Sequence, residues 1–254
     1  MEIKPRIIDI VSFNGEIELF KLRYEILKDI VDEFIIVQSP TTFSGNQRKM
    51  HYLEYPKVSN FIDNENYSDE EIEQSRKSIY TNGEERWMRE WLQKESLKKA
   101  LIAYDCDDED IIYIGDVDEI WEHREPNGIE KLKLRVYTYY LNLESNEQFW
   151  GTIRCRYKDI KDKCLNDVRN DTSYRTQDYQ GWHFTNMGGY EAVEQKIKDQ
   201  YNEQFFNQTM IGTLLPQNFG IKDYIGRDFK LEINEEHWPH YLKEHKQEYI
   251  NLCK

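Results

Sequence analysis

The stretch RIIDIVSFNGEIELFKLRYEILKDIVDEFIIVQ, residues 6–38, decides the fold class. Arg6–Phe13 is rich in β-branched residues, which favour a strand, and Asn14-Gly15 is a turn signal. Apolar residues then recur at spacings of three and four, which predicts a helix that packs one face on a sheet. These residues are Ile17, Phe20, Tyr24, Leu27 and Val31. Because a second short apolar run follows at Glu33–Gln38, the stretch predicts a βαβ unit and a parallel sheet.

The segments that follow continue this α/β pattern. A polar loop at residues 41–50 leaves the second strand on the side where open α/β sheets bind ligands. Ser68–Ser78 predicts a charged helix, and a further helix from Trp87 to Tyr104 precedes the solvated acidic loop Asp105–Asp110. Asp110–Gly115 (DIIYIG) holds four apolar residues between polar ends, which is typical of a central strand covered on both faces.

The second half of the chain is richer in aromatic residues and in predicted strands. Beyond Pro126-Asn127-Gly128 we expect a helix, then a long strand over Leu134–Leu143 and another strand over Phe149–Tyr157. A last helix is expected from Tyr190. No repeat, low-complexity tract or linker divides the sequence, so the prediction is one α/β domain over residues 1–254.

Charge and apolar content limit the partners of the chain. Lys and Arg total 34 against 48 Asp and Glu, and the net charge of −14 argues against nucleic acid or an anionic membrane as the main partner. The apolar stretch Ile7–Phe13 is too short for a signal-peptide core or a membrane span, so we expect a cytoplasmic protein. The four cysteines show neither metal-binding nor disulfide-framework spacing.

Asp116 and Asp118 are the strongest chemical signal in the sequence. In an extended segment, residues two apart point the same way with Cα atoms about 6.5 to 7 Å apart, so the two carboxylates can converge on one ion. Hard oxygen ligands at that spacing suit Mg²⁺ or Mn²⁺. In glycosyl transfer such an ion neutralises the charge that grows on a nucleoside diphosphate leaving group. The alternative is that the acids only cap a turn, because the DxD pattern is short and common in acidic chains.

Segments spread over most of residues 6–200 carry a further pattern. They are Phe13-Asn14 with Glu18-Leu19 and Leu22-Arg23, Val31–Phe34 with Thr42–Gly45, Trp87 with Arg89-Glu90, Asp110–Ile120, and Gly181–Phe184. Together they resemble glycosyltransferase family 17, the group of the β-1,4-mannosyl-glycoprotein N-acetylglucosaminyltransferases. The sequence departs from that family's pattern at Gln38, where Glu is frequent, and at Trp121, where Pro is usual.

The resemblance implies a fold and a reaction. The expected fold is GT-A-like, a Rossmann-type mixed sheet flanked by helices in a single domain, with a donor-binding half at about residues 1–125 and an acceptor-side half at about 126–254. The expected reaction moves a sugar, N-acetylglucosamine as first choice, from a UDP-sugar donor to a glycan hydroxyl. It needs a divalent metal, Mn²⁺ or Mg²⁺, and inverts the sugar carbon.

The same motifs nominate site residues. The expected metal ligands are Asp116, Asp118 and His183. The expected donor-binding residues are Asn14, Arg23, Thr42, Ser44, Gly45, Asp116, Trp182 and Lys196. The candidates for catalytic acid or base are Asp178, Glu191 and Glu119, since inverting transfer needs a group that takes the acceptor's proton. Two roles stay open for Arg23, Arg89 and Lys196, which either neutralise the diphosphate or support the acidic motif. His183 is also compatible with a core position in an aromatic cluster.

Two alternatives to glycosyl transfer remain at this point. A metal-dependent nucleotidyltransferase uses the same kind of carboxylate pair on a similar sheet, but the sequence lacks a basic Gly-rich phosphate loop. A non-catalytic carbohydrate-binding protein could rely on the 18 Tyr and 6 Trp side chains alone. Asp116 and Asp118 would then have no role.

Overall fold

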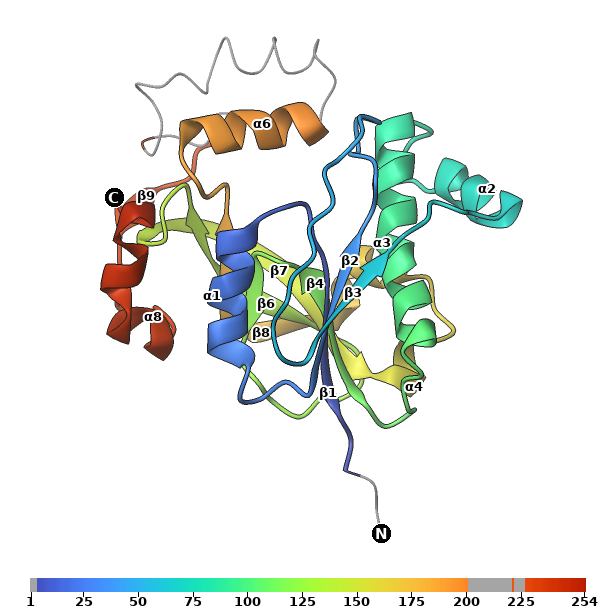
Figure 1. The fold of residues 1–254 in the computed structure, drawn as a ribbon, viewed down its shortest axis with the longest axis horizontal. Coiled ribbons are helices and arrows are strands. Elements are labelled where there is room, and N and C mark those ends of the chain that lie inside the picture. The colour runs from blue at the N-terminus through green and yellow to red at the C-terminus, as the bar shows by residue number, and fades with distance from the viewer. Residues whose placement is uncertain (1–3, 201–220, 222–226) are drawn as a thin grey trace.

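A mixed β-sheet runs through the centre of the molecule, with helices packed on both of its faces (Figure 1). The structure is a computed structural model that describes residues 4–200, 221 and 227–254. The strands within these residues form one nine-stranded sheet in the order β3-β2-β1-β4-β7-β6-β8-β5, with β9 paired to β7. The prediction of a single α/β domain with a mixed sheet flanked by helices is confirmed.

The first half of the sheet is parallel. β1 (Ile7–Ser12) lies between β2 (Glu33–Gln38) and β4 (Ile111–Asp116), and β3 (Val58–Ile62) lies outside β2. The helices of this half are α1 (Ile17–Leu27), α2 (Asp69–Lys77) and α3 (Glu85–Ala103). The predicted βαβ unit and central strand are therefore confirmed. Because parallel strands end at the same edge, Ser12 and Asp116 lie side by side in register.

The second half of the sheet is antiparallel apart from the pair of β6 and β8. Its strands are β5 (Glu119–Trp121), β6 (Glu130–Thr138), β7 (Leu143–Arg156), β8 (Arg175–Thr185) and β9 (Leu231–Ile233). Its α-helices are α4 (Tyr157–Ile160), α5 (Leu165–Asn170), α6 (Tyr190–Gln200) and α8 (His240–Glu244). The 3-10 helices among the described residues of this half are η1 (Thr172–Tyr174) and η3 (Lys246–Leu252). No helix in the described part of the chain is long and apolar enough to cross a membrane.

Separate hydrophobic clusters cover the two faces of the sheet. One contains Phe20 of α1 and Leu242 of α8, and the other contains Leu101 of α3 and Val168 of α5. Helix α6 lies across the edge where β1, β2 and β4 end, and a small third cluster including its Val193 anchors it (Figure 1). The carboxyl ends of the parallel strands, the usual ligand side of an open α/β sheet, are thus overhung by a helix.

One predicted element is wrong. The helix expected beyond Pro126-Asn127-Gly128 does not form, because β6 begins at Glu130. Leu132, Leu134 and Val136 alternate with charged residues, and an alternation with a period of two is typical of a strand rather than a helix.

Two predicted strands differ in their bounds. The strand expected over Leu134–Leu143 ends at Thr138, since the chain turns at Tyr139, whose φ is +68°. The strand expected over Phe149–Tyr157 begins earlier, at Leu143, and ends at Arg156. The long aromatic run is therefore two strands joined by a turn, which places β6 and β7 side by side.

Candidate active site

Asp116 ends β4 and lies among positive charges. Its Oδ1 accepts hydrogen bonds from the Ser12 hydroxyl and from the ammonium group of Lys94 in α3. A guanidinium nitrogen of Arg169, in α5, lies 3.6 Å from Oδ2. Burial alone would raise the pKa of this carboxyl, but Lys94 and Arg169 outweigh it and hold the pKa well below its usual range. Asp116 is therefore ionised at neutral pH, and 31% of its side chain is exposed.

Asp118 follows in the turn between β4 and β5 and contacts two further cationic groups. Its Oδ2 lies 3.5 Å from the ammonium group of Lys196 in α6 and 3.5 Å from Nε2 of His183 in β8. Burial would raise the pKa of Asp118, but Lys196 and His183 lower it overall. Burial would likewise lower the pKa of His183, and Asp118 raises it overall. The two neighbouring acids are thus held as carboxylates by cations from four different elements.

The ring of His183 is fixed in its position beside Asp118. It stacks on Phe149 of β7 with ring centroids 4.1 Å apart. Its Nδ1 is buried and has no hydrogen-bond partner among the described residues. His183 therefore contacts Asp118 and also belongs to an aromatic contact, while its role as a metal ligand stays a prediction.

A buried ion pair supports the backbone of the acidic turn. Arg23 in α1 pairs with Asp9 in β1 at 2.5 Å, and both side chains are fully buried. The same guanidinium donates to the carbonyl oxygens of Asp116 and Glu119 at 3.2 and 2.6 Å. The indole of Trp121 donates to Asp9 from the far side of the turn. Arg23 thus supports the acidic motif, the second of the two roles considered for it, and is not among the described residues that line the cavity near that motif.

Glu119 is enclosed within the sheet. Its Oε2 accepts a hydrogen bond of 3.1 Å from the Thr152 hydroxyl, and only 1% of the residue is exposed. A Cβ atom at Gly115 or Gly151 would lie under 3 Å from its carboxyl group, so the two glycines leave the room it occupies. Burial and the charge of Asp116 raise its pKa. In this position Glu119 packs under the turn and has no access to a substrate hydroxyl.

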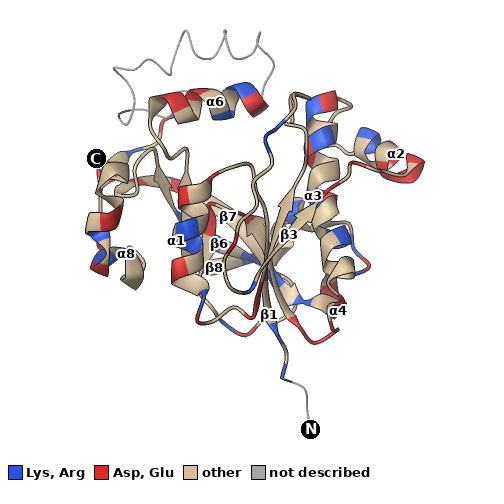
Figure 2. Ribbon diagram, in the orientation of Figure 1, with Lys and Arg blue, Asp and Glu red and all other residues tan. Residues whose placement is uncertain are grey.

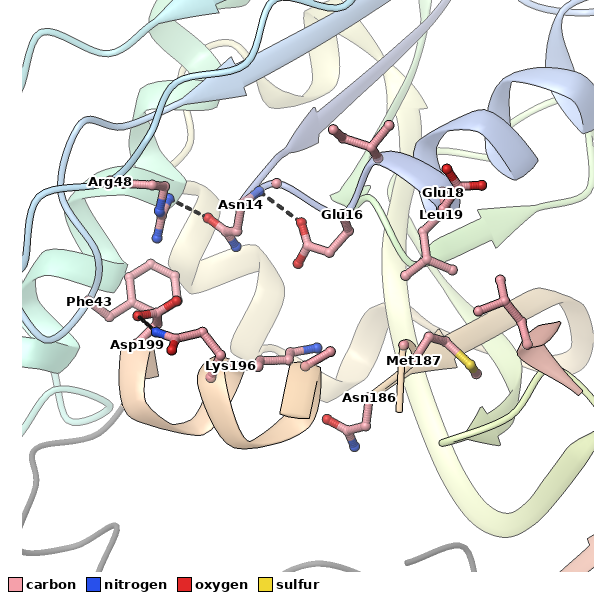
Figure 3. A pocket seen from close by; sticks show the side chains of 16 residues that line it. Asn14, Glu16, Glu18, Leu19, Phe43, Arg48, Asn186, Met187, Lys196 and Asp199 are labelled. Atoms are coloured by element: carbon pink, nitrogen blue, oxygen red, sulfur yellow. Dashed lines mark hydrogen bonds between the residues drawn. The ribbon is translucent and has the colours of Figure 1, made fainter. Parts of the chain in front are cut away.

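A cavity of about 430 Å³, whose lining side chains are drawn in Figure 3, opens close to the acidic pair. The residues that line it come from the turn 14–16 and the start of α1, the loop 43–48, the segment 186–188, α6 and the end of η3. Neither acid lines the cavity, but Lys196 lines it and also contacts Asp118, so the cavity adjoins the acidic pair at Asp118. Asn14, a predicted donor residue, lines it as well, with its backbone N–H donating to Glu16 and its side-chain oxygen accepting from Arg48 (Figure 3).

Four charged residues of this region carry no sequence motif and were not predicted. Glu16 and Arg48 line the cavity, and Lys94 and Arg169 flank Asp116. Burial raises the pKa of Glu16 against the opposing charge of Lys196, and burial lowers the pKa of Arg48. The sequence places two of these residues near the expected ligand side, since Glu16 follows the first strand and turn directly and Arg48 belongs to the polar loop 41–50. Lys94 and Arg169 belong to helices that only the tertiary fold brings to the site.

The predicted donor loop lies at the side of the cavity as a closed turn. The hydroxyls of Thr42 and Ser44 are 2.9 Å apart, and the N–H of Gly45 donates to the carbonyl of Thr42. Phe43, which lies between Thr42 and Ser44, lines the cavity. Thr42, Ser44 and Gly45 do not line it. The guanidinium of Arg89 donates to the Phe43 carbonyl, so Arg89 supports the loop.

Three other predicted residues lie away from the acidic pair. Trp182 precedes His183 on β8 and therefore points to the opposite face, where its indole donates to the His237 carbonyl. Asp178 is exposed five residues before His183, roughly 16 Å along the strand. Glu191 is exposed on α6 and does not line the cavity.

The acidic pair offers two carboxylates to a metal ion. Within the described residues, no group of three or more His, Cys, Asp and Glu side chains is arranged to hold one. Mg²⁺ is commonly bound by one or two carboxylates together with substrate phosphates and water, and Mn²⁺ accepts the same oxygen ligands. The pair therefore fits an ion held jointly with a diphosphate and does not fit one held by protein ligands alone.

Comparisons with known proteins bear on the whole chain. No curated protein matches it. The family model of glycosyltransferase family 17 matches residues 1–253, which include the parallel half with Asp116 and the antiparallel half with His183. A match of this extent shows that the chain belongs to glycosyltransferase family 17 and is a glycosyltransferase.

Proposed function

We propose that this glycosyltransferase moves a sugar, N-acetylglucosamine as first choice, from a UDP-sugar to a glycan hydroxyl, with a divalent metal and with inversion. The observation that carries the proposal is the position of two ionised carboxylates, Asp116 and Asp118, beside a cavity of about 430 Å³ at the carboxyl edge of the parallel strands. Ligands of open α/β sheets bind at that edge. Family membership sets aside the nucleotidyltransferase and the non-catalytic carbohydrate-binding protein.

The acids and the cations of the site have different roles toward the diphosphate of the donor. Asp116 and Asp118 would hold Mn²⁺ or Mg²⁺ together with the donor's phosphates, and the metal when bound stabilises negative charge on the leaving group. Lys94 and Lys196 place ammonium groups beside the same two carboxylates. Fixed positive charges of this kind favour the diphosphate as it departs, because they need no reorganisation during the reaction.

The donor has room to extend away from the acids. Asn14, Phe43 and Arg48 line the large cavity and also a small hollow that reaches Lys94. Phe43 offers a ring for stacking, and Arg48 offers a guanidinium for phosphate or hydroxyl oxygens. This continuity supports a donor that lies along the edge of the sheet with its diphosphate near Lys94 and Lys196.

Glu16 replaces the three earlier candidates as our proposed general base. Its carboxyl lines the cavity, accepts a hydrogen bond from the Asn14 N–H at 2.9 Å, and has a raised pKa. A carboxylate with a raised pKa is a stronger base toward an acceptor hydroxyl. Asp178 and Glu191 are exposed outside the cavity lining, and Glu119 is enclosed by the sheet.

A thermal-stability panel tests the donor and the metal. Wild type and Asp118→Ala are melted with a series of nucleotide sugars, each with Mn²⁺ and with a chelator. A UDP-sugar should raise the Tm of the wild type only with Mn²⁺, and Asp118→Ala should lose this response. Asp178→Ala, which removes an exposed acid of β8, is the matched control and should keep it.

Two outcomes would contradict parts of the proposal. An equal rise in Tm with the chelator would contradict metal dependence, and a response to no UDP-sugar would contradict the donor class. Inversion is tested separately, by the proton coupling constant at the anomeric carbon of the product. For the base, Glu16→Gln should lower kcat much more than donor affinity.

A further inference from the structure

A row of cations and aromatic rings crosses strands β7, β6 and β8, starting beside the acidic pair. We name it the basic strip, and it consists of Lys131, Lys133, Trp150, Arg169, Arg175 and Tyr179. Strand register places its members side by side, because Lys131 pairs with Arg175, and Lys133 pairs with both Trp150 and Tyr179. The strip is therefore built from four elements, β6, β7, α5 and β8, and it runs from the buried Lys131 to the exposed Arg175.

The first part of the strip begins at the transfer site. The guanidinium of Arg169 lies 3.6 Å from Asp116, and the ammonium group of Lys131 donates to the Arg169 carbonyl. Burial, and after it the charges of Arg175 and Arg169, lower the pKa of Lys131 to about 8, against the smaller opposing effect of Asp171 and Glu119. Like charges are thus crowded together here.

The second part of the strip alternates rings with cations. The Arg175 guanidinium lies 4.4 Å from the ring centre of Trp150. The Lys133 ammonium group lies 5.6 Å from the same ring and 4.6 Å from the ring of Tyr179. Arg175 is exposed, and Lys133, Trp150 and Tyr179 are partly exposed. Rings of this kind pack against sugar faces, while their polar edges accept or donate hydrogen bonds.

The positive charge of the strip stands out in an acidic protein. The net charge of the chain is −14, and acidic residues recur on α1, α2, α6 and α8 (Figure 2). Yet among the described residues no ion pair joins Lys133 or Arg175 to a carboxylate. Arg135, the next cation of β6, differs from them because it pairs with Glu144 at 3.3 Å. An anion on the strip would relieve the repulsion among its cations.

We propose that the basic strip binds the acceptor and that the acceptor is an anionic glycan, bearing carboxylate or sulfate groups on its sugars. Trp150 and Tyr179 pack on its rings, and Lys133 and Arg175 pair with its acidic groups. Arg169, which lies beside Asp116, then contacts the end of the glycan that receives the sugar. This inference rests on the proposed function for the position of the reacting centre, and it adds the chemical class of the acceptor.

Binding of matched oligosaccharides tests the inference. A galacturonic acid hexamer and a sulfated maltohexaose are each titrated by calorimetry, with the methyl-esterified hexamer and plain maltohexaose as neutral counterparts. Wild type should bind at least one acidic probe more tightly than its neutral counterpart, and the difference should shrink in high salt. Lys133→Gln and Arg175→Gln should each weaken the acidic probe roughly threefold to fivefold, and the double variant roughly tenfold or more.

Controls separate this inference from the proposed function. Lys158→Gln removes an exposed lysine of α4 that pairs with Glu109, and it should bind the acidic probes like wild type. All three strip variants should keep the Tm response to the UDP-sugar and Mn²⁺. Equal affinity of wild type for acidic and neutral probes, or no loss in the double variant, would overturn the acceptor assignment. Failure of the Tm response in wild type would count against the donor site alone.

Discussion

The ammonium group of Lys196 and the carboxylate of Asp118 lie 3.5 Å apart, and the same lysine lines the cavity beside them. A metal ion at Asp118 would repel Lys196, because both cations favour the same oxygen. We therefore expect Lys196→Met to bind Mn²⁺ roughly fivefold more tightly without nucleotide and to bind UDP more weakly. Manganese titration by electron paramagnetic resonance and UDP titration by calorimetry measure the two effects.

The matched control for Lys196 lies on the same helix. Lys198 pairs with Glu194 one turn away, and Lys198→Met should leave both affinities unchanged. Weaker manganese binding in Lys196→Met would show that this lysine assists the metal site instead of competing for Asp118.

The buried pair of Arg23 and Asp9 makes a prediction about stability. Arg23→Met leaves Asp9 in the core without a cation and removes the bonds to the carbonyl oxygens of the acidic turn. We expect the free energy of unfolding to fall by about 3 to 5 kcal/mol in urea denaturation. Lys28→Met, which breaks the surface pair with Glu25, should cost under about 1 kcal/mol. A loss for Arg23→Met no larger than that of Lys28→Met would contradict a supporting role.

Local patterns were enough to predict the parallel half of the fold and its acidic pair. The spacing of Ile17, Phe20 and Tyr24 is visible within one helix, and Asp116 and Asp118 follow directly on an apolar strand. Such signals need no knowledge of tertiary contacts. The misread segment is 129–133, between the turn signal and the predicted strand, and it is too short to show by itself the period of two that continues through Val136.

The side chains around the acidic pair could not be predicted from local sequence patterns. Lys94 meets Asp116 from 22 residues away, and Arg48 meets Asn14 from 34 residues away. These contacts depend on the order of strands in the sheet and on the packing of α3 and α5. Trp182 was misplaced for a simpler reason, since it shares a motif with His183 but faces the opposite side of the strand.

Gly181 is required by a close approach between β8 and β5. Its φ is +143°, and a Cβ atom there would lie 2.3 Å from the Ile120 carbonyl oxygen. Gly181→Ala should therefore destabilise the protein by about 3 kcal/mol or more, from backbone strain and overpacking together. Gly128→Ala is the control, because Gly128 has φ +74° and nothing within 4 Å, and it should cost about 1 kcal/mol. Similar losses in the two variants would contradict the steric reason.

Lys131 predicts a pH dependence of stability. Its pKa is lowered to about 8 in the folded protein, by burial and by Arg175 and Arg169, from an ordinary 10.5. The unfolded chain therefore binds more protons between those values, and stability rises with pH across that window. From pH 7 to 9.5 the wild type should gain about 2 kcal/mol relative to Lys131→Met, measured by urea denaturation. Lys131→Arg keeps its charge throughout and should show no such gain. If the free energy of unfolding changed with pH equally in wild type and Lys131→Met, the lowered pKa of Lys131 beside Arg169 and Arg175 would be refuted.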